Sequence, residues 1–400
     1  MRATIVIPCY WGRPSSEPLN REDAVYDHPT PLDEPGTLGR ALESIEVLKN
    51  PDFNVVVLAA ATNQELSKRV EEKARSIVAP FKDRFPVECI SHSFEAALRE
   101  RVREVGFDDA ESLVSLTGYS NIRNMCLIVA ELARSEVAVL FDDDEVYEDP
   151  DYIDKVFENI GNEREGRYAG AIAGYYLRPE GGYLLPPPED WWMTEWPMVD
   201  AMNKAFGIID EEPRLKPTPF VFGGNMCIHR DVFRRMAFDP NVRRGEDIDY
   251  LVNCKLFGID FLLDRELSIR HLPPKSYVPA WQHFRENIYR FIYARQKLRQ
   301  QQPVDGLRHV DVEELDPYPG RCMREDLEDL IFRTSVLMGL HYKDVGDEVG
   351  FTESMRNIYY ARYDALPGFD TFISYLGYRR RWEELMGFLS KDEMLSERFL

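Results

Sequence analysis

Three consecutive aspartates, Asp142, Asp143 and Asp144, end an apolar run that begins at Val137 (VAVLFDDDE). Side chains alternate along an extended strand, so we expect Asp142 and Asp144 to converge on one hard cation, Mg²⁺ or Mn²⁺. Three adjacent like charges are costly unless a cation or hydrogen-bond donors neutralise them. The cluster therefore favours a site for a metal and a diphosphate, with an acidic turn that binds nothing as the alternative.

Two neighbouring glycines, Gly223 and Gly224, lie in the sequence FGGNMCIHR. Glycine lets the backbone approach a ligand closely, but the same pair could form a tight turn before a strand at Met226–His229. The double glycine is therefore weak evidence of a binding site by itself.

Two further carboxylates, Glu246 and Asp247, lie in the sequence RRGEDIDY, just before a helical pattern from Ile248 to Phe257. One of them can cap that helix, which would leave the other to accept a proton in catalysis. His271, in the sequence IRHLPP, could supply a neutral imidazole to a metal or could be structural.

The segments around these residues alternate between strand-like and helix-like patterns. Strands are predicted at Thr4–Pro8, Asn54–Ala61, Phe261–Leu263 and Leu267–His271, and helices at Leu38–Leu48, Glu65–Val78 and Ile122–Ala133. The alternation predicts an α/β fold with βαβ units, in which ligands bind beyond the carboxyl ends of the strands. The polar loop residues would then gather at one edge of a mainly parallel sheet.

Two long loops interrupt this pattern. The segment Trp11–Gly36, rich in proline and charge, would overhang the ligand edge as a lid or acceptor-binding loop, or would be an insertion without a role. The second, Pro186–Pro197, carries Trp191, Trp192 and Trp196. These rings could stack on a sugar or acceptor, or could fix the loop against the core.

Composition is that of a soluble enzyme of 400 residues, large enough for two or three structural units or one elaborated α/β domain. The charge of -21, from 49 basic and 70 acidic residues, disfavours nucleic-acid binding and makes a metal the natural intermediary for an anionic substrate. Six scattered cysteines without a CxxC pair indicate reduced thiols. The chain shows neither a signal sequence nor a transmembrane segment, so a cytoplasmic protein is expected.

The ordered set IVIPCY, SNIRN, FDDDE, FGGN, RGEDIDY and IRHLPP resembles the GT-A fold glycosyltransferases that use nucleotide-sugars, most closely family 2. The resemblance covers residues 1–275 and implies a catalytic domain with a nucleotide-sugar half to about residue 145 and an acceptor half at 146–275. It also implies Mg²⁺ or Mn²⁺ as cofactor and a UDP- or GDP-sugar as donor.

Carried over by position, Asp142 and Asp144 resemble the DXD pair that holds the metal on the donor diphosphate, and His271 resembles a histidine that completes the metal shell. The residues implied to contact the donor are Pro8, Tyr10, Arg123, Asn124, Asp142, Asp143, Gly223, Gly224 and Asn225. The second strand departs from the family, because the segment from Ala59 to Asn63 lacks the acidic residue that relatives often present to the base or ribose.

Glu246 and Asp247 match the ED motif, whose aspartate is the general base of inverting members. The resemblance thus implies hexose transfer to an unknown hydroxyl acceptor, with Asp247 accepting the acceptor's proton and inversion at the anomeric carbon. The same histidine, His271, also occurs in retaining relatives that act on small acids such as phosphoglycerate, so a retaining enzyme is the alternative.

Residues 276–400 differ in character from the rest. A long helix is predicted at Trp281–Gln302, a linker at Val304–Arg321, and mainly helix from Glu325 to Leu400. The arginine-rich long helix could touch a lipid-linked acceptor or membrane, but packing on the catalytic domain or a homo-oligomer contact is favoured.

Two other classes of protein use similar residues. A metal-dependent nucleotidyltransferase would carry a glycine-rich basic loop after its first strand, which PCYWGRP matches poorly. A catalytically silent module that binds a sugar nucleotide or glycan would not need Asp142, Asp144, Asp247 and His271 together. Release of pyrophosphate from a nucleoside triphosphate would identify the first class, and binding without hydrolysis or transfer the second.

Overall fold

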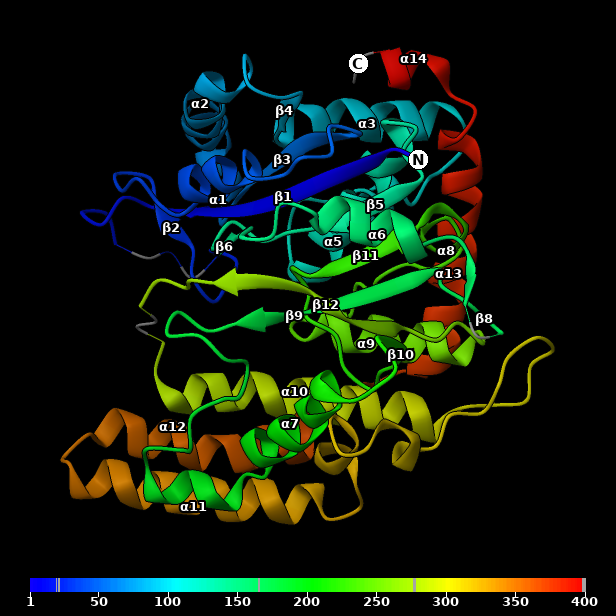
Figure 1. Cartoon of the computed structure of the whole chain (residues 1–400). Coiled ribbons are helices and arrows are strands. Elements are labelled where there is room, and N and C mark those ends of the chain that lie inside the picture. Colours follow the sequence, from blue (N-terminus) through cyan, green and yellow to red (C-terminus); the bar gives the residue numbers. More distant parts are fainter. Residues whose placement is uncertain (19, 21, 165, 276–277, 398–400) are drawn as a thin grey trace.

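The computed structural model describes residues 1–18, 20, 22–164, 166–275 and 278–397 (Figure 1). It has one large mixed sheet flanked by helices and a C-terminal group of helices, so the predicted α/β class is confirmed and is consistent with a GT-A-like fold. Residues 276–277, where the predicted C-terminal region begins, and 398–400 lie outside the described part of the chain.

The sheet is parallel on one side and mixed on the other. In spatial order its main strands are β10 (Leu215–Pro217), β12 (Leu262–His271), β9 (Ala171–Leu177), β11 (Met226–His229), β5 (Val137–Leu140), β1 (Ala3–Gly12), β3 (Phe53–Ala61) and β4 (Val87–Ile90). Strands β4, β3, β1 and β5 are parallel to one another, whereas β11 is antiparallel to both neighbours. Two short strands, β2 (Thr30–Pro31) and β6 (Glu145–Val146), pair with β1 and β12.

Alternating side chains of the strands feed two hydrophobic cores, one on each face of the sheet. On β1, Val6 enters one core, and Ile5 and Ile7 enter the other. Helices α1 (Leu38–Ile45), α2 (Ser67–Val78) and α6 (Tyr152–Asn159) cover one face, and α3 (His92–Glu104), α5 (Tyr119–Leu132), α8 (Arg230–Phe233) and α9 (Glu246–Leu256) cover the other.

The predicted strands and helices are found at nearly the predicted places, with three differences. Strand β1 continues through Pro8 to Gly12 instead of ending in a loop. Strand β5 ends at Leu140, and the aspartates follow in a turn, where the Glu145 amide donates to the Asp142 carbonyl. The two short strands predicted before His271 are one strand, β12, whose register shifts between Leu263 and Ser268.

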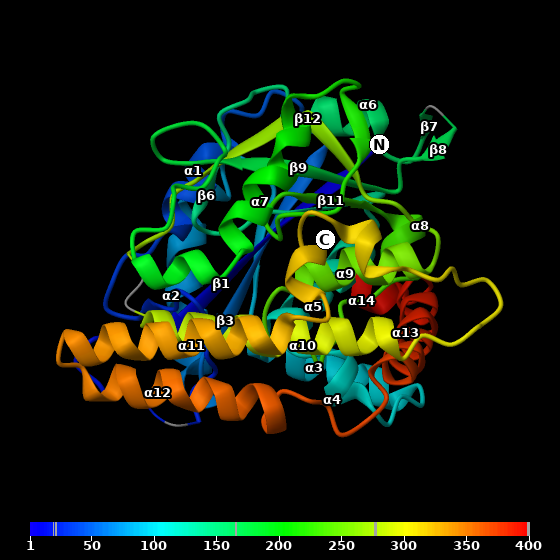
Figure 2. The same cartoon turned by 90° about the horizontal axis from the view of Figure 1, so that it is seen from below.

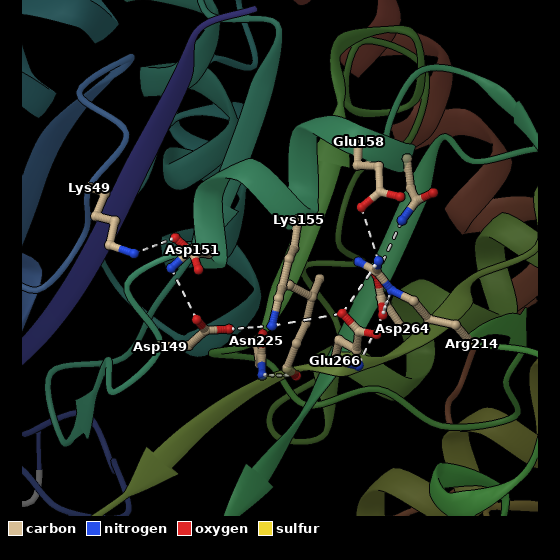
Figure 3. Close-up of polar contacts among 11 residues, drawn as sticks. Lys49, Asp149, Asp151, Lys155, Glu158, Arg214, Asn225, Asp264 and Glu266 are labelled. Carbon is tan, nitrogen blue, oxygen red and sulfur yellow. Dashed lines mark hydrogen bonds and ion pairs between the residues drawn. The ribbon is translucent and has the colours of Figure 1, made fainter.

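Ion pairs connect β12 with α6 (Figure 3). Arg214 makes two 2.8 Å hydrogen bonds to Asp264 of β12 and also pairs with Glu158 of α6. Lys155 of α6 pairs with Asp149 and reaches Glu266 of β12. These contacts hold in place the strand that ends at the candidate site.

The C-terminal helices pack against the rest of the molecule (Figure 2), and most of them contribute side chains to the same core. They are α10 (Ala280–Arg299), α11 (Leu327–Asp344), α12 (Glu348–Tyr359), α13 (Thr371–Leu389) and α14 (Glu393–Glu397). The predicted linker contains two 3₁₀ turns, η5 (Val312–Leu315) and η6 (Gly320–Met323). The boundary near residue 275 stays a prediction, because the described residues on its two sides share one core.

All six cysteines are buried and free, as expected for reduced thiols. Among the described residues, no helix combines the length and the apolar character that crossing a membrane requires.

Candidate functional site

A polar cavity of about 350 Å³ lies at the carboxyl ends of β1 and β5. Nine of its residues are predicted from the ordered motifs. The predicted residues on the wall are Tyr10, Arg123, Asp142, Asp143, Asp144, Gly223, Glu246, Asp247 and His271. The motif residues thus come together from α5, the loop after β5, the start of α9 and the end of β12.

Arg123 connects the two acidic groups of the cavity. Its guanidinium donates to both carboxylate oxygens of Asp142, at 2.6 and 2.9 Å, and its Nε donates to Glu246 Oε1 at 3.2 Å. Burial alone would lower the pKa of Arg123, but the carboxylates of Asp142 and Glu246 raise it, so the guanidinium stays charged. Asp142 is therefore held by a cation of the protein itself.

Asp144 and His271 form the second polar pair. His271 Nε2 lies 3.2 Å from Asp144 Oδ2, and burial, which raises the pKa of Asp144, is outweighed by this histidine, so that the pKa lies below its usual value. Asp143 points elsewhere and accepts from Thr37 Oγ1 at 2.8 Å. Burial and the neighbouring Asp144 charge raise the pKa of Asp143, so added positive charge would stabilise this turn.

A divalent metal fits this pair, although no three acidic, histidine or cysteine side chains of the described chain already form a closed ligand cluster. Mg²⁺ is commonly bound through one or two carboxylates together with substrate phosphates and water. Asp144 and His271 would supply the ligands from the protein, and Asp142 could join them only by sharing its carboxylate with Arg123.

Glu246 and Asp247 occupy the first turn of α9, but neither caps the helix. The cap position is Gly245, which has a φ of 73° that favours glycine, and a Cβ there would lie 2.9 Å from Arg290 Cδ. Asp247 accepts from the backbone amides of Gly223 at 3.1 Å and Ile248 at 2.8 Å. Burial nevertheless keeps the pKa of Asp247 raised, and burial together with the Asp247 charge raises that of Glu246.

The double glycine makes room for buried charged side chains. A Cβ on Gly223 would approach Arg123 Nη2 to 2.6 Å, and one on Gly224 would overlap the carboxylate of Glu145. Glu145, the last residue of the FDDDE motif, has no role predicted from the sequence and is fully buried. Its Oε2 accepts from the Asp142 amide, and its Oε1 has no partner among the described residues. The glycines therefore permit close packing behind the cavity wall.

Four of the predicted donor-binding residues do not line the cavity. Pro8 is buried inside β1, and Gly224 lies behind the wall. Asn124 exchanges hydrogen bonds with the backbone of Phe238. Asn225 bonds to Tyr152 and to backbone carbonyls of neighbouring strands, and it lies beside the ion pairs in Figure 3. The amide side chains of the RN and FGGN motifs thus fix backbone instead of facing a ligand.

The loop between residues 11 and 36 does overhang the site, as expected. It supplies Asp27 and His28 to the wall, and its Tyr26 packs with Tyr10 and Tyr119 at ring-centroid distances of 4.5 and 5.2 Å. The Asp27 amide donates to Tyr119 Oη at 2.6 Å, which anchors the loop. This loop therefore forms one side of the cavity.

Several wall residues have no individual role predicted from the sequence, although some of them lie within the motifs or the overhanging loop: Asp27, His28, Tyr119, Tyr176, Phe222, Arg244, Gly245 and Arg290. Arg244 and Gly245 adjoin the ED motif and could have been suggested by proximity. Arg290 comes from α10, 43 residues beyond Asp247, so only the tertiary packing brings it to the cavity.

A second cavity, of about 440 Å³, adjoins the first and is mainly apolar. The two share Phe222, Arg244, Asp247 and Arg290. Trp192 and Trp196 of the second loop line this apolar cavity, whereas Trp191 is 53% exposed.

No protein-family model matches this sequence, and no curated protein resembles it significantly. Among solved structures, the mannosyltransferase PcManGT from Pyrobaculum calidifontis, in complex with GDP-Man and Mn²⁺, is similar with a TM-score of 0.43 and 13% identity, over 99% of this chain and 86% of that one. GalNAc-T7 with UDP, GalNAc and Mn²⁺ is similar with a TM-score of 0.35 and 12% identity, over 85% of this chain and 58% of that one. Both similarities are too low to assign an activity.

Proposed function

We propose that this protein is a divalent-metal-dependent glycosyltransferase that moves a hexose from a nucleoside diphosphate sugar to a hydroxyl acceptor. The observation that carries the proposal is the presence of two groups in one cavity: Asp144 with His271, and the half-buried carboxylate of Asp247. The first suits the metal-bound diphosphate of a donor, and the second suits removal of a proton from an acceptor.

In this mechanism, different side chains of the cavity would bind the metal and accept the proton. Asp144 and His271 would hold Mg²⁺ or Mn²⁺, which neutralises the diphosphate as it leaves. Asp247, oriented by the amides of Gly223 and Ile248, takes the proton of the acceptor hydroxyl. Arg123 keeps Asp142 and Glu246 in place around the reacting centre, and attack opposite to the leaving group would invert the anomeric carbon.

Thermal stabilisation by nucleotides tests the donor half of the proposal. UDP, GDP and their hexose conjugates are added with Mn²⁺, with Mg²⁺ or with chelator, and a metal-dependent rise in Tm confined to one nucleotide family is expected. Asp144→Asn should abolish that rise, whereas Asp83→Asn, at an exposed position remote from the cavity, should keep it. An equal rise for Asp144→Asn would refute the assigned metal site.

The reaction itself separates the proposal from the other classes. Slow hydrolysis of the stabilising nucleotide sugar, with release of the nucleoside diphosphate, is expected. Pyrophosphate release from a nucleoside triphosphate would instead identify a nucleotidyltransferase, and binding without any turnover a silent binding module. The anomeric configuration of the product, read by NMR, distinguishes an inverting from a retaining enzyme.

A further inference from the structure

The apolar cavity opens directly onto the carboxylate that we propose as the general base. Asp247 lies on the walls of both cavities, with Phe222 and Arg290 beside it. An acceptor hydroxyl placed at Asp247 would therefore have the rest of its molecule directed either into the polar donor cavity or into the apolar one. The donor fills the first, so the second is left for the acceptor.

The lining of this cavity selects an apolar ligand. Its walls come from the second loop, from α7 (Met198–Phe206) and from α10. The side chains that give it its character are Trp192, Trp196, Met198, Val199, Met202 and Phe284. Polyhydroxylated molecules would have to give up hydrogen bonds to water against such a surface, whereas hydrocarbon or an aromatic ring would gain free energy there.

Two tryptophans form a large part of the apolar wall of this cavity. Trp192 and Trp196 are 4% and 8% exposed, and within the described chain their indole N–H groups have no hydrogen-bond partner. Trp196 is fixed by edge-to-face packing on Phe284 at 5.0 Å. Both N–H groups are themselves buried, so the two rings present mainly apolar surface to the cavity.

We propose that the acceptor is an alcohol with an apolar body that occupies this cavity, an inference that rests on the proposed function. The acceptor O–H bond breaks and its proton goes to Asp247, while the oxygen forms a bond to the anomeric carbon. The bond from that carbon to the diphosphate breaks, and its electron pair leaves with the nucleoside diphosphate. A volume of about 440 Å³ fits either a compact aromatic alcohol or the first part of a long-chain lipid alcohol.

Binding of a homologous series of n-alkanols, from butanol to decanol, tests this inference without a donor. Binding is followed by intrinsic tryptophan fluorescence and by the shift in Tm. Affinity should rise about fourfold per added methylene, because each buried CH₂ contributes about 0.8 kcal/mol. A plateau in the series favours a compact acceptor and makes 2-phenylethanol a good ligand, whereas a rise through decanol favours a lipid chain.

Two variants locate the binding. Met202→Gln, which places an amide on the cavity wall at similar volume, should weaken binding of the longest bound alkanol about fivefold. Val199→Phe, which fills the cavity, should weaken it as well. The control Met355→Gln lies on α12, where Met355 is 37% exposed, and should bind like the parent.

Failure of the inference and failure of the proposed function give different results. If no alkanol binds, or if glycerol, glucose or 3-phosphoglycerate binds more tightly or is glycosylated faster than every alkanol, the apolar acceptor is refuted even when donor binding is intact. If alkanols bind as expected but no nucleotide gives a metal-dependent shift, the cavity is supported as an apolar site and the glycosyltransferase proposal is refuted.

Discussion

Asp247 is the residue on which the proposed chemistry depends most directly. Asp247→Asn keeps the shape but cannot take up a proton. It also keeps only one of the two hydrogen bonds from the amides of Gly223 and Ile248, because these amides donate to different carboxylate oxygens and asparagine retains one oxygen. We expect nucleotide-induced stabilisation to persist and transfer to fall by about 10²–10⁴-fold, the usual contribution of a positioned base. Single-turnover transfer assays alongside the thermal shift measure both quantities, and transfer at the parental rate would exclude Asp247 as the base.

The ionisation of Asp247 also predicts a pH dependence. Burial raises the pKa of this carboxyl, so activity should fall, as pH decreases, at a higher pH than for an ordinary aspartate. The charge of Arg290 opposes that rise, and Arg290→Met should therefore raise the pKa further and move the acidic limb of kcat/KM to higher pH. Arg380→Met, on an arginine that is 81% exposed, should leave the profile unchanged. A limb that stays in place or moves to lower pH in Arg290→Met would contradict this electrostatic role.

The residues of the candidate site were predicted from the sequence where several motifs follow one another in a characteristic order. Asp142, Asp144, Asp247 and His271 lie in ordered motifs, and all line one cavity. Whether a motif residue contacts a ligand or the protein's own backbone could not be predicted. Asn225, for example, could do either according to the sequence, and in the structure it donates to strand carbonyls. The burial of Glu145 depends on the space left by Gly224 in the turn before β11, which no local pattern encodes.

At the scale of elements, the docking of α10 onto α9 depends on a buried charge. Lys297 of α10 is fully buried, with Nζ 2.8 Å from Asp239 and 2.7 Å from Asp249 of α9. Lys297→Met would leave two buried carboxylates facing each other without a cation. A loss of about 3–5 kcal/mol in the free energy of unfolding is expected, measured by urea denaturation.

Lys343→Met provides the matched control for this prediction. Lys343 lies on α11, is 55% exposed and pairs with Glu348, so removing it should leave the urea midpoint almost unchanged. Equal stability of Lys297→Met and the parent would mean that Asp239 and Asp249 take up protons at little cost, and the buried pair would then not be what secures α10.

Helices and strands with a strong hydrophobic periodicity were predicted well, whereas the residues at which they end were predicted less well. The helix at Ala280–Arg299 and the strand at Met226–His229 match their patterns closely. Pro8 suggested the end of β1, yet the strand passes through it, because β5 pairs with β1 only as far as Val6. The aspartates after β5 were expected to meet through strand alternation, but a turn brings them to the cavity. In both places, contacts with residues distant in the sequence determine where the strand ends.

At the scale of the whole molecule, the predicted catalytic and C-terminal regions share one hydrophobic core. Trp382 and Tyr375 of α13 are fully buried, and they donate hydrogen bonds to the carbonyls of Phe233 and Ala237. Phe284 of α10 belongs to the same core and lines the apolar cavity. The C-terminal helices are therefore part of what stabilises the site.

This shared core predicts that residues 1–275 do not form an independent domain. Without α10 and α13, the apolar side chains of α5 and α9 that pack against them would be exposed to water. The cost of exposing several large side chains exceeds the usual stability of a domain. The truncated chain should aggregate or lack a cooperative thermal transition by circular dichroism, whereas the full chain should melt in one transition. A soluble 1–275 fragment with a cooperative melt and the same nucleotide-induced shift in Tm would instead establish the domain boundary predicted from sequence, and the C-terminal helices would then act only on the acceptor side.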